Sequence, residues 1–328
     1  MILAGDIGGT NTRLAYFEAR QGRLEPVVVQ VFPSREHKGL EEIVAKFRAA
    51  HDLPVEQAAF GVAGPVRGDI CATPNLAWRV DGRRLAKDLG LAAVHLLNDL
   101  EANAHGIAAL DPADFAVLNE GAPDAAGNAV LISPGTGLGE AGLIWHEGRY
   151  RPFPSEGGHA DFAPRDDLQV ELLRYLLSKF EHVSYERVLS GPGLYNLYQF
   201  LRDTGRGEEP AWLADRIGTA DPPAVITQSA LSGESELCVA AMDLFLSIFG
   251  AEAGNLALKV MAAGGVFLGG GMPPRIVSKL REEGFLRAFR AKGRMSELMG
   301  AIPVQVILND KTALFGAGRV AADRLAAA

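Results

Sequence analysis

The chain has 328 residues, of which 48% are hydrophobic and 22% are charged, and its net charge is -8. This composition is typical of a globular protein, and the length corresponds to roughly two domains. The excess of acidic residues disfavours a nucleic-acid partner. Two cysteines far apart in the sequence cannot build a disulfide framework. No uncharged stretch reaches the ~18 residues that a membrane-spanning helix needs. Because no basic and apolar leader precedes Asp6, we expect a cytoplasmic protein without a membrane partner.

The first hundred residues predict a hairpin that opens a mixed sheet, followed by alternating helices and strands. The expected strands are short apolar or β-branched runs, and the expected helices carry apolar residues three or four positions apart. The strands are Ile2–Asp6, Arg13–Phe17, Val27–Phe32, Ala58–Ala63 and Val94–Leu97, and the helices are Gly39–His51, Arg83–Leu89 and Leu100–Ala109.

A second copy of the opening pattern follows. The strand Ala129–Ile132 leads into Gly135-Thr136-Gly137 and the strand Ala141–Trp145, just as the first strand leads into Gly8-Gly9-Thr10. An internal repeat of this size predicts two related domains, with a boundary near the polar pair Asp111-Pro112.

The remainder is predicted to be mostly helical. Its expected elements are the helices Leu168–Phe180, Gly193–Leu201, Leu237–Ala263 and Thr312–Leu325 and the strands Val266–Leu268 and Ile302–Leu308. The polar stretch Thr204–Pro223 is expected to be irregular and receives no function.

The two glycine turns are the first candidates for chemistry. Glycines let backbone N–H groups approach an anion, so paired turns in two repeated domains would grip a polyphosphate from both sides, and Asp6 could hold Mg²⁺. The alternative is a hairpin that only needs positive φ at Gly8 or Gly9. A Walker A loop is excluded because no lysine follows either turn, and the spacing of Gly135–Gly139 does not match the dinucleotide fingerprint. A third cluster, Gly264–Gly271, could accommodate a base or ribose, or mark close packing of a helix on a strand.

Polar side chains form the second group of candidates. Asn98-Asp99 follows an apolar strand, where catalytic carboxylates of α/β sheets gather, although either residue could simply cap the next helix. Ser155–His159 and Glu186 could hydrogen-bond several hydroxyls, and the loop from Thr73 through Asn75 to Trp78 could face a sugar. The alternative for His159 is a structural histidine.

Together these motifs resemble the bacterial glucokinase family, a sugar-kinase branch of the actin-like ATPase superfamily, over nearly the whole chain. The residues that carry the resemblance are Gly5–Asn11, Asn98-Asp99, Gly135–Gly139, Glu156–His159, Glu186–Gly193 and Gly264–Gly271, in the order that the family has them.

The resemblance implies an α/β, two-domain actin-like ATPase (ribonuclease H-like) fold with the active site in an inter-domain cleft. The closing helix would return to the first domain, giving residues 1–110 with 311–328 and residues 111–310. The implied activity is transfer of the ATP γ-phosphoryl group to the 6-hydroxyl of glucose with Mg²⁺, feeding glycolysis, in a homodimer.

The resemblance also assigns roles to single residues. Asp99 is the implied general base for the sugar hydroxyl. The implied sugar ligands are Asn75, Asn98, Glu156, His159 and Glu186. The implied nucleotide and Mg²⁺ contacts are Gly5, Asp6, Ile7, Gly8, Gly9, Thr10, Gly135, Thr136, Gly137, Gly265 and Gly270.

Two residues depart from what the resemblance predicts. Pro134 precedes the second glycine loop where a small flexible residue is expected, and Glu140 adds a carboxylate just after it, which suits a triphosphate only if it turns away. Related zinc-bearing sugar kinases have a cysteine-rich loop that this chain lacks, so His159 is interpreted as a sugar ligand. The alternatives are another hexose or an N-acetylated amino sugar as substrate, another phosphate donor, or a non-catalytic sugar-sensing protein of the same fold.

Overall fold

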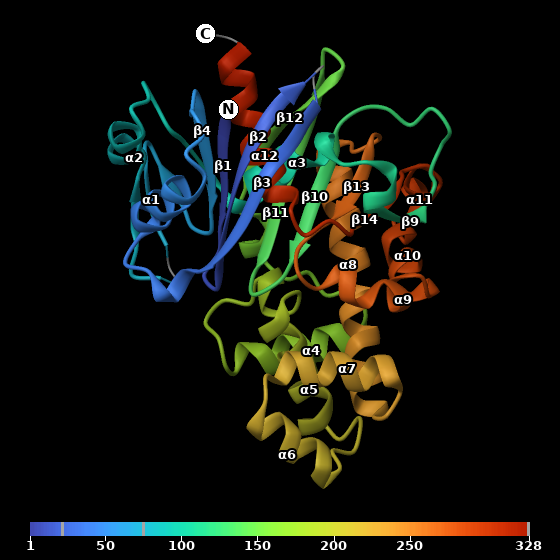
Figure 1. Cartoon of the computed structure of the whole chain (residues 1–328). Helices are drawn as coiled ribbons and strands as arrows, with labels where there is room; N and C mark the ends of the chain where they lie inside the picture. The colour runs from blue at the N-terminus through green and yellow to red at the C-terminus, as the bar shows by residue number, and fades with distance from the viewer. Residues whose placement is uncertain (21–22, 74–75, 327–328) are drawn as a thin grey trace. The chain divides into compact units, whose positions relative to one another are not determined.

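A computed structural model describes residues 1–20, 23–73 and 76–326, and the chain divides into two compact units (Figure 1). The first unit contains Met1–Asp114, Arg149–Pro154 and Asn309–Ala328, and the second contains Phe115–Gly148 and Ser155–Leu308. Each unit has its own mixed sheet and its own hydrophobic core, which confirms the expected α/β class.

The sheet of the first unit begins with the predicted hairpin. Strands β1 and β2 are antiparallel, β3 continues the meander, and β4 and β8 lie parallel to β1, in the order β3-β2-β1-β4-β8. The bounds are β1 (Ile2–Ile7), β2 (Asn11–Arg20), β3 (Arg23–Pro33), β4 (Gln57–Val62) and β8 (His95–Asn98); a small sheet holds β5 (Val66–Arg67), β6 (Ile70–Ala72) and β7 (Arg79–Asp81).

Helices cover both faces of this sheet. Successive side chains of β1 point to opposite faces, and apolar side chains lie on both of them. Leu3 and Ile7 pack with α1 (Leu40–His51) and α2 (Gly82–Leu89), whereas Ile2 and Ala4 pack with α12 (Thr312–Ala326). Helix α3 (Asp99–Gly106) lies against α12 (Figure 1). The predicted helices of this unit are thus present, and α3 begins one residue earlier than expected.

The sheet of the second unit repeats the device of the first, as the sequence predicts. Strands β10 and β11 form an antiparallel pair around the glycine loop, β13 and β14 lie parallel to β10, and β9 closes the order β11-β10-β13-β14-β9. The bounds are β9 (Phe115–Asn119), β10 (Ala129–Pro134), β11 (Leu138–His146), β13 (Gly265–Leu268) and β14 (Val304–Ile307); β12 (Arg149–Ser155) follows β11 in the chain.

Helix α8 (Glu236–Val260) is the centre of the second core. It is long and apolar enough to cross a membrane, but 78% of its most apolar window is buried inside the protein, as in a core helix. The other helices of this unit are α4 (Asp167–Leu177), α5 (Gly191–Asp203), α6 (Ala211–Thr219), α7 (Pro222–Ser232), α9 (Val277–Leu280), α10 (Glu283–Arg290) and α11 (Ser296–Gly300).

The prediction of irregular structure over Thr204–Pro223 is wrong. The segment contains α6, whose buried Leu213 and Ile217 lie four residues apart on one face, and α7 begins at Pro222 behind the N-cap Asp221 (Figure 1). The many polar residues around these two apolar positions hide the helical period, because α6 buries only a narrow stripe.

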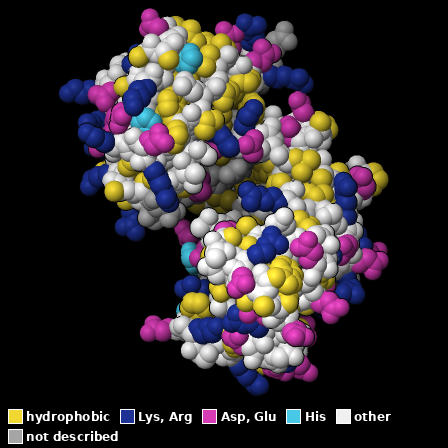
Figure 2. All heavy atoms as spheres, turned by 60° about the horizontal axis from the view of Figure 1, so that its bottom comes forward, with side chains coloured by type: hydrophobic (Ala, Val, Ile, Leu, Met, Phe, Trp, Pro, Cys, Tyr) yellow, Lys and Arg dark blue, Asp and Glu magenta, His cyan; other side chains and the backbone are white. Residues whose placement is uncertain are grey.

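Charged side chains of both signs are interspersed over the face that Figure 2 shows. Among the side chains drawn on that face, Lys and Arg do not form one continuous patch. The mixture is consistent with the net charge of -8. On the face shown, it gives no support to a basic surface that would bind the phosphates of a nucleic acid.

Candidate active site

The first glycine turn joins β1 to β2 and is fixed by Ser34. The N–H of Gly8 donates to the Asn11 carbonyl at 2.9 Å, the Ser34 hydroxyl donates to the Gly8 carbonyl at 2.7 Å, and the Ser34 N–H donates to the Thr10 carbonyl at 2.9 Å. Neither Gly8 nor Gly9 has a positive φ. The turn therefore does not need glycine for a left-handed backbone; at Gly8 a Cβ would crowd the Asn11 carbonyl oxygen at 3.0 Å, and the role of both glycines in binding a phosphate stays a prediction.

Two residues of this first motif, Gly5 and Ile7, are packed in the hydrophobic core. Gly5 lies within β1, where a Cβ would meet Phe60 and Leu14 side chains at 2.5 Å and 2.9 Å, and Ile7 is 1% exposed. Their side-chain positions are thus explained by packing, and only their backbone could reach a phosphate. Ser34 was missed by sequence reasoning, since nothing in its neighbourhood links it to the turn.

The register of the parallel strands brings Asp6 and Asp99 to one sheet edge. Ile7 pairs with Val62, and Val62 pairs with Asn98. The C-terminal ends of β1, β4 and β8 therefore lie side by side at one edge of the sheet. Burial raises the pKa of Asp6 to about 6, against the opposing charge of Arg13, and the charge of Asp99 raises it further. This is the edge at which open α/β sheets bind ligands.

The structure separates the roles of Asn98 and Asp99. Asn98 is the N-cap of α3: its Oδ1 accepts from the Leu100 N–H at 2.9 Å, and its Nδ2 donates to the Gly64 carbonyl at 3.0 Å. Asp99 is the first residue of the helix, half-buried, and burial raises the pKa of its carboxyl. The N-cap of α3 is therefore Asn98, and the Asp99 carboxyl lies beside the backbone N–H groups of the helix start and the Asn98 side chain, which lower its pKa against the effect of burial. Asn75 lies outside the described residues.

The second glycine loop is held by Glu186. Glu186 Oε2 accepts from the Leu138 N–H at 2.9 Å, the Gly135 N–H donates to the Gly137 carbonyl at 2.8 Å, and the Gly191 N–H donates to the Gly135 carbonyl at 2.8 Å. A Cβ at Gly137 would overlap the Glu186 carboxylate. These three hydrogen bonds fix the conformation of the loop and join it to the start of α5.

The remaining polar candidates of the second unit are brought together by short bridges. Glu156 precedes the 3-10 turn η4 (Gly157–His159) as its N-cap, His159 is the last residue of that turn, and Glu186 lies in η5 (Tyr185–Arg187). The Tyr185 N–H donates to the Ala160 carbonyl at 3.0 Å and ties the two turns. Glu156 and His159 are exposed and Glu186 is half-buried, so three polar side chains that can bind hydroxyls belong to one tied pair of turns.

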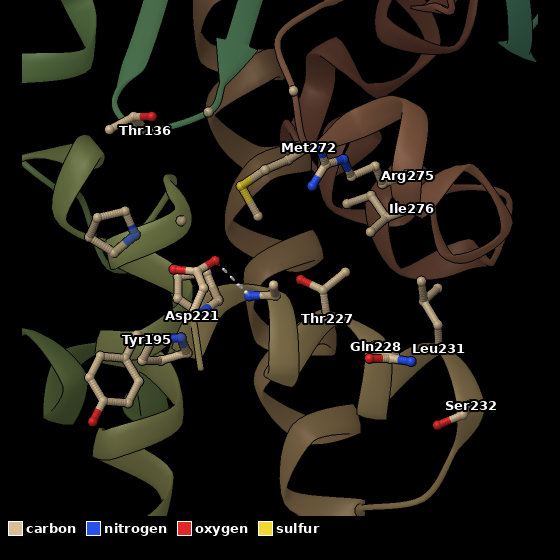
Figure 3. A pocket seen from close by; sticks show the side chains of 17 residues that line it. Thr136, Tyr195, Asp221, Thr227, Gln228, Leu231, Ser232, Met272, Arg275 and Ile276 are labelled. Carbon is tan, nitrogen blue, oxygen red and sulfur yellow. Dashed lines mark hydrogen bonds between the residues drawn. The ribbon is translucent and has the colours of Figure 1, made fainter. Parts of the chain in front are cut away.

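A cavity of about 930 Å³ opens beside the second glycine loop. Figure 3 shows Thr136 at one end, Tyr195 of α5 on one side, and Thr227 of α7 facing Met272 and neighbouring residues. The full lining is Gly135, Thr136, Gly191, Pro192, Tyr195, Asp221, Pro222, Pro223, Ala224, Thr227, Gln228, Leu231, Ser232, Gly271, Met272, Arg275 and Ile276. The volume suits a ligand the size of a nucleotide.

Sequence reasoning missed the α7 wall of this cavity. Asp221 accepts from the Ala224 N–H at 3.3 Å as the N-cap of α7, which places its carboxylate at the cavity rim (Figure 3). The signal was present in Asp221-Pro222-Pro223, because an N-cap residue followed by proline is typical of a helix start. The polar residues around these three positions predict an irregular segment and obscure this signal.

The two ends of the third glycine cluster do not share a site. Gly270 follows β13 with a φ of 83°, where a Cβ would lie 2.6 Å from the Pro134 carbonyl oxygen, and its neighbour Gly271 lines the large cavity. Gly265 begins β13 with a φ of 133° and lines a separate hollow of about 280 Å³ with Pro303. The nucleotide roles of Gly265 and Gly270 both stay predictions, and only Gly270 adjoins the large cavity, through its neighbour Gly271.

Comparisons with known proteins agree over the full length. The model of the family described as Glucokinase matches residues 3–324. A glucokinase from Synechocystis sp. is 41% identical over 98% of this chain and 97% of its own. The crystal structure of a glucokinase from an Antarctic psychrotroph has a TM-score of 0.85 and 31% identity, covering 98% of both chains. A ROK family glucokinase from Streptomyces griseus in complex with glucose and AMPPNP shares the fold, with a TM-score of 0.61 and 22% identity over 98% and 99% of the two chains.

Proposed function

This chain belongs to the glucokinase family, and on that premise we propose that it transfers the γ-phosphoryl group of ATP to the 6-hydroxyl of glucose. The observation that carries the proposal is the cavity beside the Gly135–Gly137 loop, which offers a phosphate-binding turn and a nucleoside-sized hollow in one place. A relative that binds glucose and AMPPNP supports the same pair of substrates.

Asp99 is the general base in this proposal. Its carboxyl lies at the carboxyl ends of the parallel strands and has a pKa raised by burial, which makes its ionised form a stronger base. Removing the proton from the 6-hydroxyl as the phosphoryl group arrives requires such a group, whereas the transfer itself needs mainly positioning and charge neutralisation.

The sugar is held by Glu156, His159 and Glu186, whose carboxylates and imidazole accept or donate to hydroxyls. The side chain of Asn98 is engaged as a helix cap and through Gly64, so its sugar contact would use the remaining amide hydrogen. The phosphates lie on the two glycine turns.

The donor set around Asp6 fits Mg²⁺. The charge of Asp99 adds to the negative potential at Asp6, and Arg13 partly neutralises it, since its guanidinium lies 3.6 Å from Asp6 Oδ2 and also pairs with Asp310 at 2.7 Å. A hard cation prefers such oxygen ligands, directly or through water. Asp6 would hold Mg²⁺, which when bound neutralises charge on the phosphate oxygens.

A coupled assay with ATP and Mg²⁺ over glucose, mannose and N-acetylated amino sugars tests the proposal. We expect glucose to give the highest kcat/KM. Phosphorylation of an amino sugar with little activity on glucose would overturn the substrate, and no ATP consumption with any sugar would favour a sensing protein of the same fold.

The nucleotide cavity gives a separate prediction. In Thr227→Phe, a ring enters the space that Thr227 faces from α7 (Figure 3), so KM for ATP should rise at least about tenfold while KM for glucose changes little. Steady-state kinetics with each substrate varied in turn measures both. The control is Thr219→Phe on the exposed end of α6. Equal ATP constants in the two variants would place the nucleotide elsewhere.

We also propose a cytosolic homodimer that carries no structural zinc. Both free cysteines, Cys71 and Cys238, are buried and unpaired with each other, as in proteins of a reducing compartment. In the described part of the chain, no three His, Cys, Asp or Glu residues gather as metal ligands. Elemental analysis should therefore find far less than one zinc per chain, and stoichiometric zinc with activity lost to a zinc-selective chelator would contradict this.

A further inference from the structure

Two glutamates are buried in the second unit with part of each carboxylate unsatisfied. Glu140 of β11 is 1% exposed, and Glu252 of α8 is 0% exposed. Within the described residues, Oε1 of each has no hydrogen-bond partner, although Lys259 Nζ lies 3.7 Å from Oε1 of Glu252. Buried polar atoms nearly always have partners, so this pair requires an explanation.

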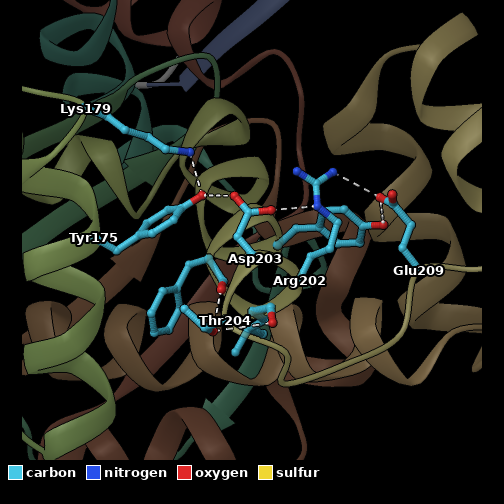
Figure 4. A network of polar contacts seen from close by, with 9 residues as sticks. Tyr175, Lys179, Arg202, Asp203, Thr204 and Glu209 are labelled. Carbon is cyan, nitrogen blue, oxygen red and sulfur yellow. Dashed lines mark hydrogen bonds and ion pairs between the residues drawn. The ribbon is translucent and has the colours of Figure 1, made fainter.

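Carboxylates elsewhere in the same unit are well partnered. In the network of Figure 4, Tyr175 donates to Asp203 Oδ2 at 2.5 Å, and Arg202 donates to Asp203 Oδ1 at 2.9 Å and to Glu209 Oε1 at 3.2 Å. The donors on Asp203 hold the pKa of its carboxyl below the usual range. Among the described residues, Oε1 of Glu140 has no such donor, so its position favours the neutral acid.

Glu140 lies directly beneath the turn that carries the sugar candidates. A Cβ at Gly157 would overlap Glu140 Oε2, and a Cβ at Gly158 would overlap the Leu138 carbonyl. The turn therefore packs on β11 through its glycine backbone, with the Glu140 carboxyl beneath Gly157 and the Ser155 hydroxyl accepting from the Gly157 N–H at 3.0 Å. Glu156 and His159 flank this glycine pair, so any movement of Gly157 is transmitted to both side chains.

The charge state of Glu140 changes near neutral pH. Burial, followed by the negative charge of Glu252, raises the pKa of Glu140 to about 7, and Lys259 only partly opposes this. Other titratable groups lie on the elements packed around Glu140: Glu252 and Lys259 of α8, Tyr185 of η5, Glu156 and His159 at η4, and Lys292. Lys292 is engaged elsewhere, since it donates to Asn255 at 2.5 Å and to the Ala251 carbonyl at 2.8 Å. None of these is close enough to hydrogen-bond Oε1 of Glu140.

An ionised Glu140 has to gain water or move, because a buried carboxylate beside a second one is unstable without a partner. Strand β11 is fixed by its pairing with β10, where Glu140 lies opposite Ile132. The turn above it is held by the Gly157 N–H, which donates to Ser155 Oγ at 3.0 Å, and by the Tyr185 N–H, which donates to the Ala160 carbonyl at 3.0 Å. Because these single bonds restrain the turn less than a strand ladder restrains β11, the turn is the part that moves.

We propose that Glu140 is a positioning residue for sugar binding: its neutral carboxyl supports Gly157 so that Glu156 and His159 face the sugar, and its ionisation releases the turn. The proposal rests on the proposed function, in which these two side chains hold the sugar. It also explains how the extra carboxylate after the second glycine loop is tolerated, since Glu140 is turned under η4 and does not line the nucleotide cavity.

The test is KM for glucose between pH 6 and 8.5 in the wild type, Glu140→Gln and Glu140→Ala, with the exposed Glu297→Gln as control. Glutamine reproduces the neutral acid, so KM for glucose of Glu140→Gln should stay low and constant across this range. The ratio of the wild-type KM to the Glu140→Gln KM should rise about tenfold from pH 6 to 8.5. Alanine removes the support, so KM should be raised about tenfold at every pH with kcat within about threefold. Glu297→Gln should follow the wild type.

A second measurement needs no sugar and no activity. Hydrogen exchange of the amides of residues 156–160 should accelerate in the wild type relative to Glu140→Gln as pH rises through 7. Glu252→Gln removes the neighbouring charge, lowers the pKa of Glu140 and should move this change to lower pH. A Glu140→Gln protein that keeps the wild-type pH dependence, or loses sugar binding as Glu140→Ala does, overturns the proposal. If the wild type did not phosphorylate glucose, the proposed function would fall, and exchange alone would decide the role of Glu140.

Discussion

Replacing Asp99 with asparagine should lower kcat by about 10²–10⁴, the usual size of a general-base contribution. The substitution keeps the shape of the side chain and removes its basicity. Because an amide still hydrogen-bonds a hydroxyl in the ground state, KM for glucose should change much less than kcat. Steady-state kinetics and a sugar-binding titration on the same preparation measure the two quantities.

The structure makes this prediction sharper than the sequence could. Since Asn98 is the N-cap of α3, a stability role for Asp99 reduces to the favourable position of an acid in the first turn of a helix, which is worth less than about 1 kcal/mol. Asp99→Asn should therefore melt nearly normally. The matched control is Asn98→Ala, which removes the cap and should cost about 1 kcal/mol of stability. Near-full kcat in Asp99→Asn would show that another group is the base.

Much of the fold was predictable because its signals are local. The antiparallel hairpins around Gly8–Thr10 and Gly135–Gly137 follow from alternating apolar runs interrupted by glycine, and both appear with the expected register of strand, turn and strand. The closing helix α12 follows from its apolar period. The α6 helix escaped prediction because a short helix that buries two residues carries little periodic signal.

The sequence could point to candidate residues only where a local motif contains a reactive or hydrogen-bonding side chain. Asp99 and Glu186 belong to such motifs, and their roles stay predictions. Ser34 and Asp221, by contrast, act through contacts with residues far away in the sequence, and Glu140 can be understood only from the carboxylate and the glycine turn that fold against it. Spacing along a chain does not encode which side chains share a buried environment.

The crossing of α3 and α12 carries the prediction with the largest expected loss of stability. A Cβ at Gly316 of α12 would overlap the Ala102 carbonyl of α3, and a Cβ at Gly106 would overlap the Thr312 carbonyl. Both obstacles are backbone, which cannot rotate away as a side chain can. Gly316→Ala should therefore force the helices apart and destabilise the first unit by about 3 kcal/mol, the upper end of overpacking costs.

The control for Gly316→Ala lies two residues further along the same helix. A Cβ at Gly318 would meet only side chains, the nearest being Phe17 at 3.2 Å, which can shift by a few tenths of an ångström. Since alanine also favours helix by up to about 1 kcal/mol over glycine, Gly318→Ala should be close to wild type in thermal denaturation. Equal melting of the two variants would mean that the helices do not approach as closely as described.

The same substitution should affect catalysis through the start of α3. Asp99 is the first residue of this helix, so a helix pushed away from α12 carries the carboxylate with it. A misplacement of about 1 Å can cost about 100-fold in rate, so folded Gly316→Ala should lose kcat well beyond what its unfolded fraction explains. Measuring kcat at a temperature where circular dichroism shows the variant fully folded separates the two effects. If kcat of the folded protein is unchanged, the packing of α3 on α12 stabilises the unit without positioning Asp99, and the position of that carboxylate is set by β8 and the Asn98 cap.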